Sequence, residues 1–191
     1  MAEMVPPGFG NVFDNVELDK PLGPNDIKQL MNTWPEGRYK GIIPCNHLCI
    51  RCDGSIDTDH GKSPGGIETA YGFIITTDLN YPIAWDHGRV PKEEGVTVNV
   101  GEYFAVIKAL ELLDGIGPAA YHDFETRVYS DSQLIIRQIN GEYSVTKPHL
   151  KRLRDRVREL AAKWKKITFI WVPREQNEMA DKLATSTWET P

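Results

Sequence analysis

The sequence is short of cysteine and has no long apolar run, and each shortage excludes a class of protein. No stretch of its 191 residues approaches the roughly 20 apolar residues that a membrane-spanning helix needs. Its first residues lack the basic and then apolar layout of a secretion signal, so we expect a cytoplasmic protein with no membrane partner. The three cysteines lie within eight residues and cannot form a paired disulfide framework, so we expect reduced thiols.

The chain length allows one well-buried domain and an appendage. Residues 1–44 contain six prolines and show little periodicity apart from one short helical pattern at residues 25–34. We therefore predict a Pro-rich, partly ordered N-terminal extension over residues 1–44 and a catalytic domain over residues 45–191.

From residue 47 onwards the pattern becomes regular. Three strand patterns, at residues 47–52, 69–77 and 81–90, are followed by a helix over residues 101–115. A strand, two helices, a strand and a helix complete the chain, at residues 125–130, 131–140, 147–164, 167–172 and 175–186. This order predicts an α/β fold with a mixed sheet and helices packed on it.

The cysteine-containing run "CNHLCIRCDGS", residues 45–55, has two interpretations. Cys45, His47, Cys49 and Cys52 could ligate zinc, but zinc ligands usually come from two separated pairs. If the run is a strand, its side chains alternate, so Cys49 and Cys52 point to opposite faces. We therefore predict that the thiols fill the core and that the acid that follows, Asp53, is the functional group.

Four acids occupy the junctions between elements. Besides Asp53, they are Glu102, Asp131 and Asp181. Any one of them alone is more simply explained as a surface residue or a helix cap. Strand ends and helix starts of such a fold meet at one edge, and four clustered carboxylates would repel one another unless cations neutralised them. Hard divalent ions such as Mg²⁺ prefer these ligands.

The segments "CDGS", "NVGEYFAVIKALELL", "YSDSQLIIRQINGEY" and "VPREQNEMADKLA", in this order and spacing, resemble type 1 ribonuclease H and the ribonuclease H domains of reverse transcriptases. The resemblance covers about residues 47–187. It implies a ribonuclease H-like fold, with a five-stranded mixed sheet of three antiparallel and then two parallel strands flanked by helices.

The resemblance also implies an activity and its cofactors. Asp53, Glu102, Asp131 and Asp181 would be the catalytic acids and would bind two Mg²⁺ or Mn²⁺ ions. The expected reaction is hydrolysis of the RNA strand of RNA–DNA hybrids, which leaves 5′-phosphate and 3′-hydroxyl ends. The sequence leaves open whether double-stranded RNA is a second partner. We expect a monomer.

Several residues are candidates for binding the hybrid, whose RNA strand is distinguished by its 2′-hydroxyl groups. By motif they are Gly54, Ser55, Asn99, Glu102, Gln133 and Asn177. From the pattern alone, Asn99, Gln133 and Asn177 fit turns or caps equally well. The loop before the last helix lacks the histidine found in many members, and Arg174 is its nearest polar substitute.

The net charge is −5, but the charge is unevenly distributed and one segment is strongly basic. Residues 147–166 hold nine basic and two acidic side chains. The chain lacks both the basic handle and the N-terminal hybrid-binding module of some members, so substrate binding would depend on this helix. Its predicted basic row consists of Lys147, Lys151, Arg154 and Arg158. A solvated helix face is the alternative interpretation.

Two rival functions remain. Resolvases, integrase cores and exonucleases share the fold and an acidic site, but the segments "DSQLIIRQINGEY" and "NEMAD" argue against them. A non-catalytic, ribonuclease H-like nucleic-acid-binding module is the second rival, and the presence of all four acids argues against it.

Overall fold

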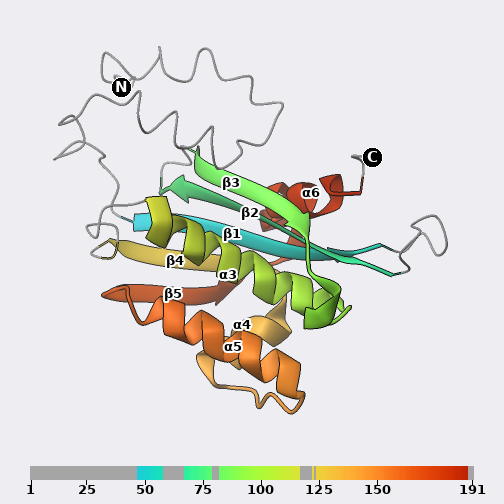
Figure 1. Ribbon diagram of the computed structural model, residues 1–191. Helices are drawn as coiled ribbons and strands as arrows, with labels where there is room; N and C mark the ends of the chain where they lie inside the picture. The colour runs from blue at the N-terminus through green and yellow to red at the C-terminus, as the bar shows by residue number, and fades with distance from the viewer. Residues whose placement is uncertain (1–46, 58–66, 79–81, 117–121, 123, 189–191) are drawn as a thin grey trace.

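The computed structural model describes residues 47–57, 67–78, 82–116, 122 and 124–188. Five strands form one sheet in the order β3-β2-β1-β4-β5 (Figure 1). They are β1 (His47–Ile56), β2 (Thr69–Thr77), β3 (Pro82–Arg89), β4 (Glu125–Ser130) and β5 (Lys166–Trp171). β1 to β3 pair antiparallel, whereas β1, β4 and β5 pair parallel. The predicted mixed sheet is confirmed. The predicted extension, its short helix and Cys45 lie outside the described residues.

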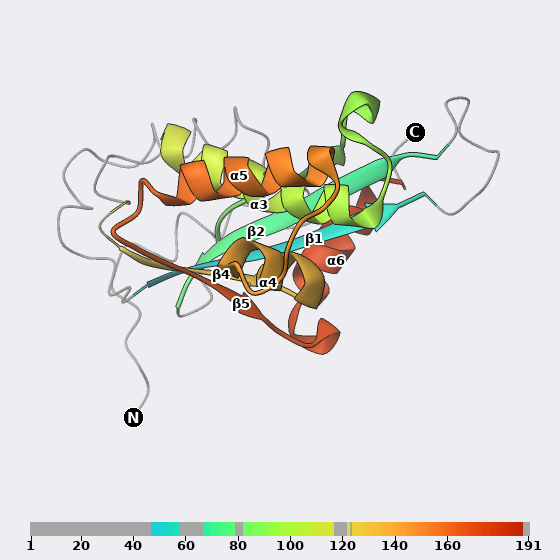
Figure 2. The ribbon, with the colours of Figure 1, turned by 90° about the horizontal axis from the view of Figure 1, so that it is seen from below.

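Helices cover both faces of this sheet. The helices are α3 (Val98–Ile116), α4 (Gln133–Asn140), α5 (Pro148–Ala161) and α6 (Glu178–Ser186), with short 3₁₀ turns η1 (Lys92–Glu94) and η3 (Arg174–Gln176). Figure 2 shows α3 and α5 on one face and α6 on the other. Among the described helices, none is both long and apolar enough to cross a membrane.

The core lies between the sheet and helices α3 and α5. Leu48, Ile50 and Cys52 of β1 belong to it, together with Tyr103 of α3. The apolar stripe predicted for the basic helix is confirmed, because all of its members are buried: Leu150, Leu153, Val157, Leu160 and Trp164. The stripe fixes which side of α5 faces the sheet, and the basic side chains therefore lie on its outer sides.

Several boundaries differ from the sequence prediction by one to four residues, and three of them bear on the acids. β1 runs to Ile56, because its pairing with β2 continues to the Ile56–Thr69 pair, so Asp53 lies inside the strand. α3 begins at Val98 rather than at residue 101, since the hydroxyl of Thr97 accepts a hydrogen bond from the Val100 N–H (3.4 Å). The last helix starts only after Asn177, following the separate turn η3.

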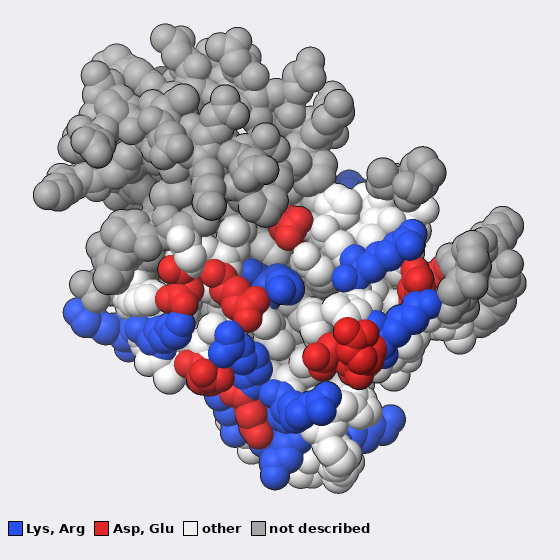
Figure 3. Space-filling model, viewed as in Figure 1, with Lys and Arg blue, Asp and Glu red and all other residues white. Residues whose placement is uncertain are grey.

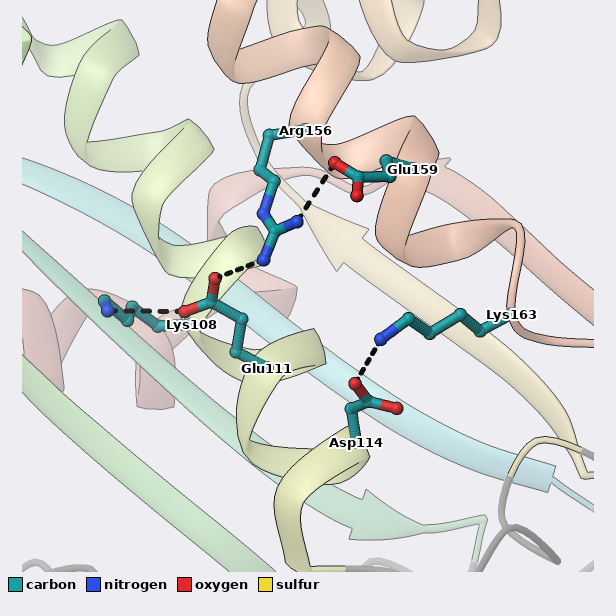
Figure 4. A network of polar contacts seen from close by, with 6 residues as sticks. All are labelled: Lys108, Glu111, Asp114, Arg156, Glu159 and Lys163. Atoms are coloured by element: carbon teal, nitrogen blue, oxygen red, sulfur yellow. Dashed lines mark hydrogen bonds and ion pairs between the residues drawn. The ribbon is translucent and has the colours of Figure 1, made fainter.

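An ionic network joins α3 to α5 on the outer surface (Figure 4). Glu111 accepts from Arg156 (3.0 Å) and pairs with Lys108 (3.3 Å), and Arg156 also pairs with Glu159 (3.0 Å). Lys163 pairs with Asp114. The charges of both signs consequently alternate over this face (Figure 3). Exposed pairs of this kind contribute little stability each, but they neutralise these cations of the α5 region.

Candidate active site

The parallel pairing of β1 and β4 places Asp53 and Asp131 side by side. The last paired residues of the two strands are Arg51 and Tyr129. Each aspartate follows two positions later in its own chain segment, and the two lie close enough for the charge of Asp131 to raise the pKa of Asp53. Asp53 is only 7% exposed, and Asp131 is half-buried.

Glu102 reaches this point from the first turns of α3. The approach is close, since a Cβ on Gly54 would lie 2.3 Å from the Glu102 nitrogen. Only glycine can therefore occupy position 54 of β1 without displacing the helix. Glu102 is 8% exposed, and its carboxylate accepts a hydrogen bond from the Ser132 hydroxyl (2.7 Å). Ser132 follows Asp131 directly and also caps α4, so one residue links the two acids.

Asp181 comes from the opposite face of the sheet, on α6. This helix lies directly on β2, where a Cβ on Gly72 would be 2.3 Å from the Ala184 nitrogen. The carboxylate of Asp181 is half-buried and accepts a hydrogen bond from Arg174 (2.5 Å). The two glycines thus allow α3 and α6 to approach the sheet and bring their acids to Asp53.

The four carboxylates influence one another electrostatically. Burial, followed by the charge of Asp131, raises the pKa of Asp53 to about 8, and Asp181 and Glu102 add to the increase. Burial also raises the pKa of Glu102 to about 7, against the hydrogen bond from Ser132. Two buried acids therefore retain protons near neutral pH in the absence of cations, and a bound cation would release them.

Each of the other acids has its own partner within the protein. Ser132 holds Glu102, Asn177 holds Asp131 and Arg174 holds Asp181. In the described ranges the side chains do not form a ready-made group of three or more metal ligands. The donor set nevertheless fits a hard divalent ion, because it consists of carboxylate oxygens and its buried charge needs compensation. Such an ion would compete with Arg174 for Asp181.

Asn177 lies fully buried at the centre of the site. Its amide nitrogen donates to the Cys52 carbonyl (2.9 Å) and to Asp131 Oδ1 (3.1 Å). Both amide hydrogens are thereby used within the protein, so Asn177 positions Asp131. The sequence predicts that Asn177 faces the site and contacts the substrate; its bond to Asp131 agrees with the first expectation, and the second stays a prediction.

The remaining predicted substrate contacts differ in availability. Gln133 is exposed at the start of α4, and Asn99 is half-buried at the start of α3. The Ser55 hydroxyl donates to the Ala184 carbonyl (2.9 Å) and accepts from Trp188 Nε1 (2.9 Å). Ser55 therefore attaches α6 to β1, and Gln133 and Asn99 are the side chains open to a ligand.

The predicted basic row divides into two pairs. Lys147 and Lys151 are exposed near the start of α5. Arg154 pairs with Asp155 (2.6 Å), and its side chain is 15% exposed. Arg158 donates to the carbonyls of Gln138 and Ile139, which end α4. The two lysines are thus the members of the row most available to phosphates.

Cys49 and Cys52 are both buried and free. Cys52 belongs to the core cluster, and Cys49 lies on the other face of β1, as strand alternation requires. Burial raises the pKa of both thiols, which keeps them protonated and unreactive. These observations favour a packing role.

Replacing both cysteines should leave catalysis intact. For Cys49→Val with Cys52→Ala, we expect a loss of about 1–2 kcal/mol in the free energy of unfolding and unchanged kcat, because the hydrogen bonds that hold the acids come from Ser132, Asn177 and Arg174 and not from the thiols. Denaturant unfolding and hybrid cleavage measure the two effects. Stoichiometric zinc in the purified wild-type chain that disappears in this variant would instead support the metal interpretation.

Two residues near the site were absent from the sequence prediction. Ser132 was recognisable as a cap, since a serine followed directly by helical residues is a common helix start. Trp171, at the end of β5, donates its indole N–H to the Asp131 carbonyl (3.0 Å). No sequence pattern identifies that contact, because it depends on the β4–β5 register.

Comparisons with known proteins agree with this fold. A family model described as reverse transcriptase-like matches residues 83–187. A bifunctional protein of Mycobacterium tuberculosis is 30% identical over 139 residues, 70% of this chain and 35% of that protein. The chain thus spans about a third of the length of that relative.

Two solved structures are similar over most of their own length. The ribonuclease H1 of Halobacterium salinarum has a TM-score of 0.62 at 28% identity, covering 76% of this chain and 99% of that one. LC11-RNase H1, isolated from compost and solved in complex with an RNA/DNA hybrid, has a TM-score of 0.63 at 29% identity, covering 74% and 96%.

Proposed function

The chain belongs to the reverse transcriptase-like family and has the fold of type 1 ribonuclease H, and from this premise we propose that it hydrolyses the RNA strand of RNA–DNA hybrids. The observation that carries the proposal is the adjacency of Asp53 and Asp131, with Glu102 close enough to raise the pKa of Asp53 further. The solved hybrid complex of LC11-RNase H1 supports the choice of substrate.

We infer that the acids hold two Mg²⁺ or Mn²⁺ ions. Asp53 would contact both, Glu102 and Asp131 would complete one site and Asp181 the other. When bound, the cations supply the positive charge that activates the attacking water and stabilises the leaving oxygen. Ser132 and Asn177 orient Glu102 and Asp131 for this task, since each donates a hydrogen bond to one carboxylate.

The expected products follow from which bond breaks. The oxygen of water joins the phosphorus, the bond from phosphorus to the 3′ oxygen breaks, and that oxygen takes up a proton. The ends are then a 5′-phosphate and a 3′-hydroxyl. Gln133 and Asn99 are the side chains that we expect to recognise ribose 2′-hydroxyl groups, because both are accessible beside the acids.

We further expect a monomer that acts in the cytoplasm. All four acids come from one chain, so the site needs no second copy. The buried free thiols Cys49 and Cys52 fit a reducing compartment.

Cleavage assays with defined duplexes test the proposal. The full chain is incubated with end-labelled RNA–DNA hybrid, double-stranded RNA and double-stranded DNA, with Mg²⁺ or Mn²⁺ and with chelator. We expect metal-dependent cutting inside the RNA strand of the hybrid, with 5′-phosphate ends. Binding of the hybrid without cutting would favour the non-catalytic module, and cutting of DNA would favour another nuclease of this fold.

The two exposed lysines should determine affinity. We expect Lys147→Ala with Lys151→Ala to raise KM while kcat stays near wild type, because contacts to phosphate position the duplex without contributing to the chemistry. The slope of log affinity against log salt should decrease by about 1.8, or about 0.9 for each lost contact. Titrations at several salt concentrations measure this slope.

A matched control removes two charges beside the same helix. Arg156→Ala with Lys163→Ala eliminates cations that are already paired with Glu111 and Asp114, so the salt slope should change by less than half as much. Equal effects of the two double variants would contradict a specific role for Lys147 and Lys151.

A further inference from the structure

Exposed apolar side chains are concentrated around the acids. Of the six large apolar side chains exposed in the described part of the chain, three flank the site. Val98 (37% exposed) precedes Glu102 by four residues on α3, about one helical turn, and Leu134 (39%) lies at the start of α4, three residues after Asp131. Trp171 (45%) hydrogen-bonds to Asp131. An exposed apolar side chain that is held beside the acids offers contact area to a substrate bound there.

Trp171 is the largest and the most firmly held of the three. It ends the edge strand β5 and pairs with Ser130, the residue before Asp131. Its indole N–H donates to the Asp131 carbonyl (3.0 Å), and the next residue, Val172, donates to the Ser130 carbonyl (3.0 Å). The only polar atom of the ring is therefore used within the protein, and the exposed remainder offers an apolar face in a fixed orientation.

We propose that the exposed ring of Trp171 contacts the sugar–phosphate backbone of the RNA strand beside the bond that is cut. This inference rests on the proposed function. The ring is held by the main-chain carbonyl of Asp131, which is one of the catalytic acids. A substrate bound at Asp131 would therefore lie next to the ring. The bases of a duplex are stacked on one another, whereas ribose rings are accessible along the wide, shallow minor groove. An aromatic ring packs on the apolar face of a ribose.

The contact of the ring with the RNA strand affects binding, whereas the hydrogen bond to Asp131 affects turnover, so the two can be measured separately. The ring contributes affinity that does not depend on salt, because no ion is released when it binds. The N–H orients Asp131 and contributes to turnover. Trp171→Phe retains an aromatic face and loses the N–H, whereas Trp171→Leu loses both.

Binding is measured by fluorescence anisotropy of a labelled hybrid, with the full chain carrying Asp53→Asn to prevent cutting. Adding Trp171→Leu should raise Kd about three- to tenfold and leave the salt slope unchanged. Adding Trp171→Phe should change Kd less than about twofold. In the otherwise wild-type chain, Trp171→Phe should lower kcat more than it changes KM.

The matched control is Tyr143→Leu. Tyr143 is also aromatic and exposed (41%), but it follows the far end of α4, an eight-residue helix about 12 Å long that starts beside Asp131. Its replacement should leave Kd unchanged. An unchanged Kd in Trp171→Leu, or an equal loss in Tyr143→Leu, would overturn the role of Trp171. A wild-type chain that neither binds nor cuts the hybrid would instead overturn the proposed function itself.

Discussion

Asp53→Asn should lower hybrid cleavage by about three orders of magnitude or more while the protein remains folded. Asp53 is the central acid of the site: it lies beside Asp131, and both Asp181 and Glu102 contribute to its raised pKa. The asparagine amide is neutral, so it has one fewer anionic oxygen to offer a cation and cannot balance the positive charge of that cation. Single-turnover cleavage with saturating Mg²⁺ measures the loss.

The same substitution should stabilise the protein in the absence of metal. The pKa of Asp53 is raised by folding, so the native state binds a proton that the unfolded chain releases between about pH 4 and pH 8. The stability of the wild type therefore falls as the pH rises through this window. Asp53→Asn removes the part of that loss that comes from the ionisation of Asp53. We expect a gain of roughly 1–3 kcal/mol at pH 8 and almost none at pH 4.

Thermal unfolding with and without Mg²⁺ connects the two expectations. Mg²⁺ should raise the Tm of the wild type, because it binds only the folded site, and should have little effect on Asp53→Asn. Glu102→Gln serves as a comparison, since the pKa of Glu102 is raised to about 7, so the loss of stability that it causes is complete at a lower pH than the loss caused by Asp53. An Asp53→Asn variant that cuts at near the wild-type rate would disprove the assignment of the central ligand.

The positions of the acids could be predicted because they depend on local signals. Strand alternation and the strand-to-helix junction at Asp131 are visible in the sequence, and the resemblance to ribonuclease H relates them to Glu102 and Asp181. Close approach of the helices follows from Gly54 and Gly72, whose absent side chains leave room for Glu102 and Ala184.

The partners of long or polar side chains could not be predicted in the same way. Helical spacing correctly places Arg154 and Arg158 on the outside of α5, yet Arg158 turns to the carbonyls at the end of α4. Ser55 likewise bonds to α6, which is 129 residues away in sequence. These choices depend on distances between elements far apart in the chain, and the periodicity of one element contains no information about them.

Asn177→Ala should lower kcat about tenfold to a hundredfold and weaken Mg²⁺ binding, although Asn177 is not among the predicted metal ligands. The substitution removes the donor that holds Asp131 and leaves the Cys52 carbonyl without its partner in a fully buried position. We therefore also expect a loss of about 1–3 kcal/mol in the free energy of unfolding. Cleavage rates as a function of Mg²⁺ concentration and denaturant unfolding measure the two effects.

Two further variants, Asn177→Asp and Asn140→Ala, distinguish the loss of a correctly positioned Asp131 from a general loss of protein stability. An aspartate at position 177 presents a second negative charge to Asp131, so it should be less stable than the alanine variant at pH 8 and should recover as the pH falls. Asn140 is an exposed asparagine that donates to the Phe169 carbonyl (3.2 Å), and its replacement should leave both kcat and the Mg²⁺ dependence unchanged. Wild-type Mg²⁺ dependence in Asn177→Ala would show that Asp131 is held in place without this hydrogen bond.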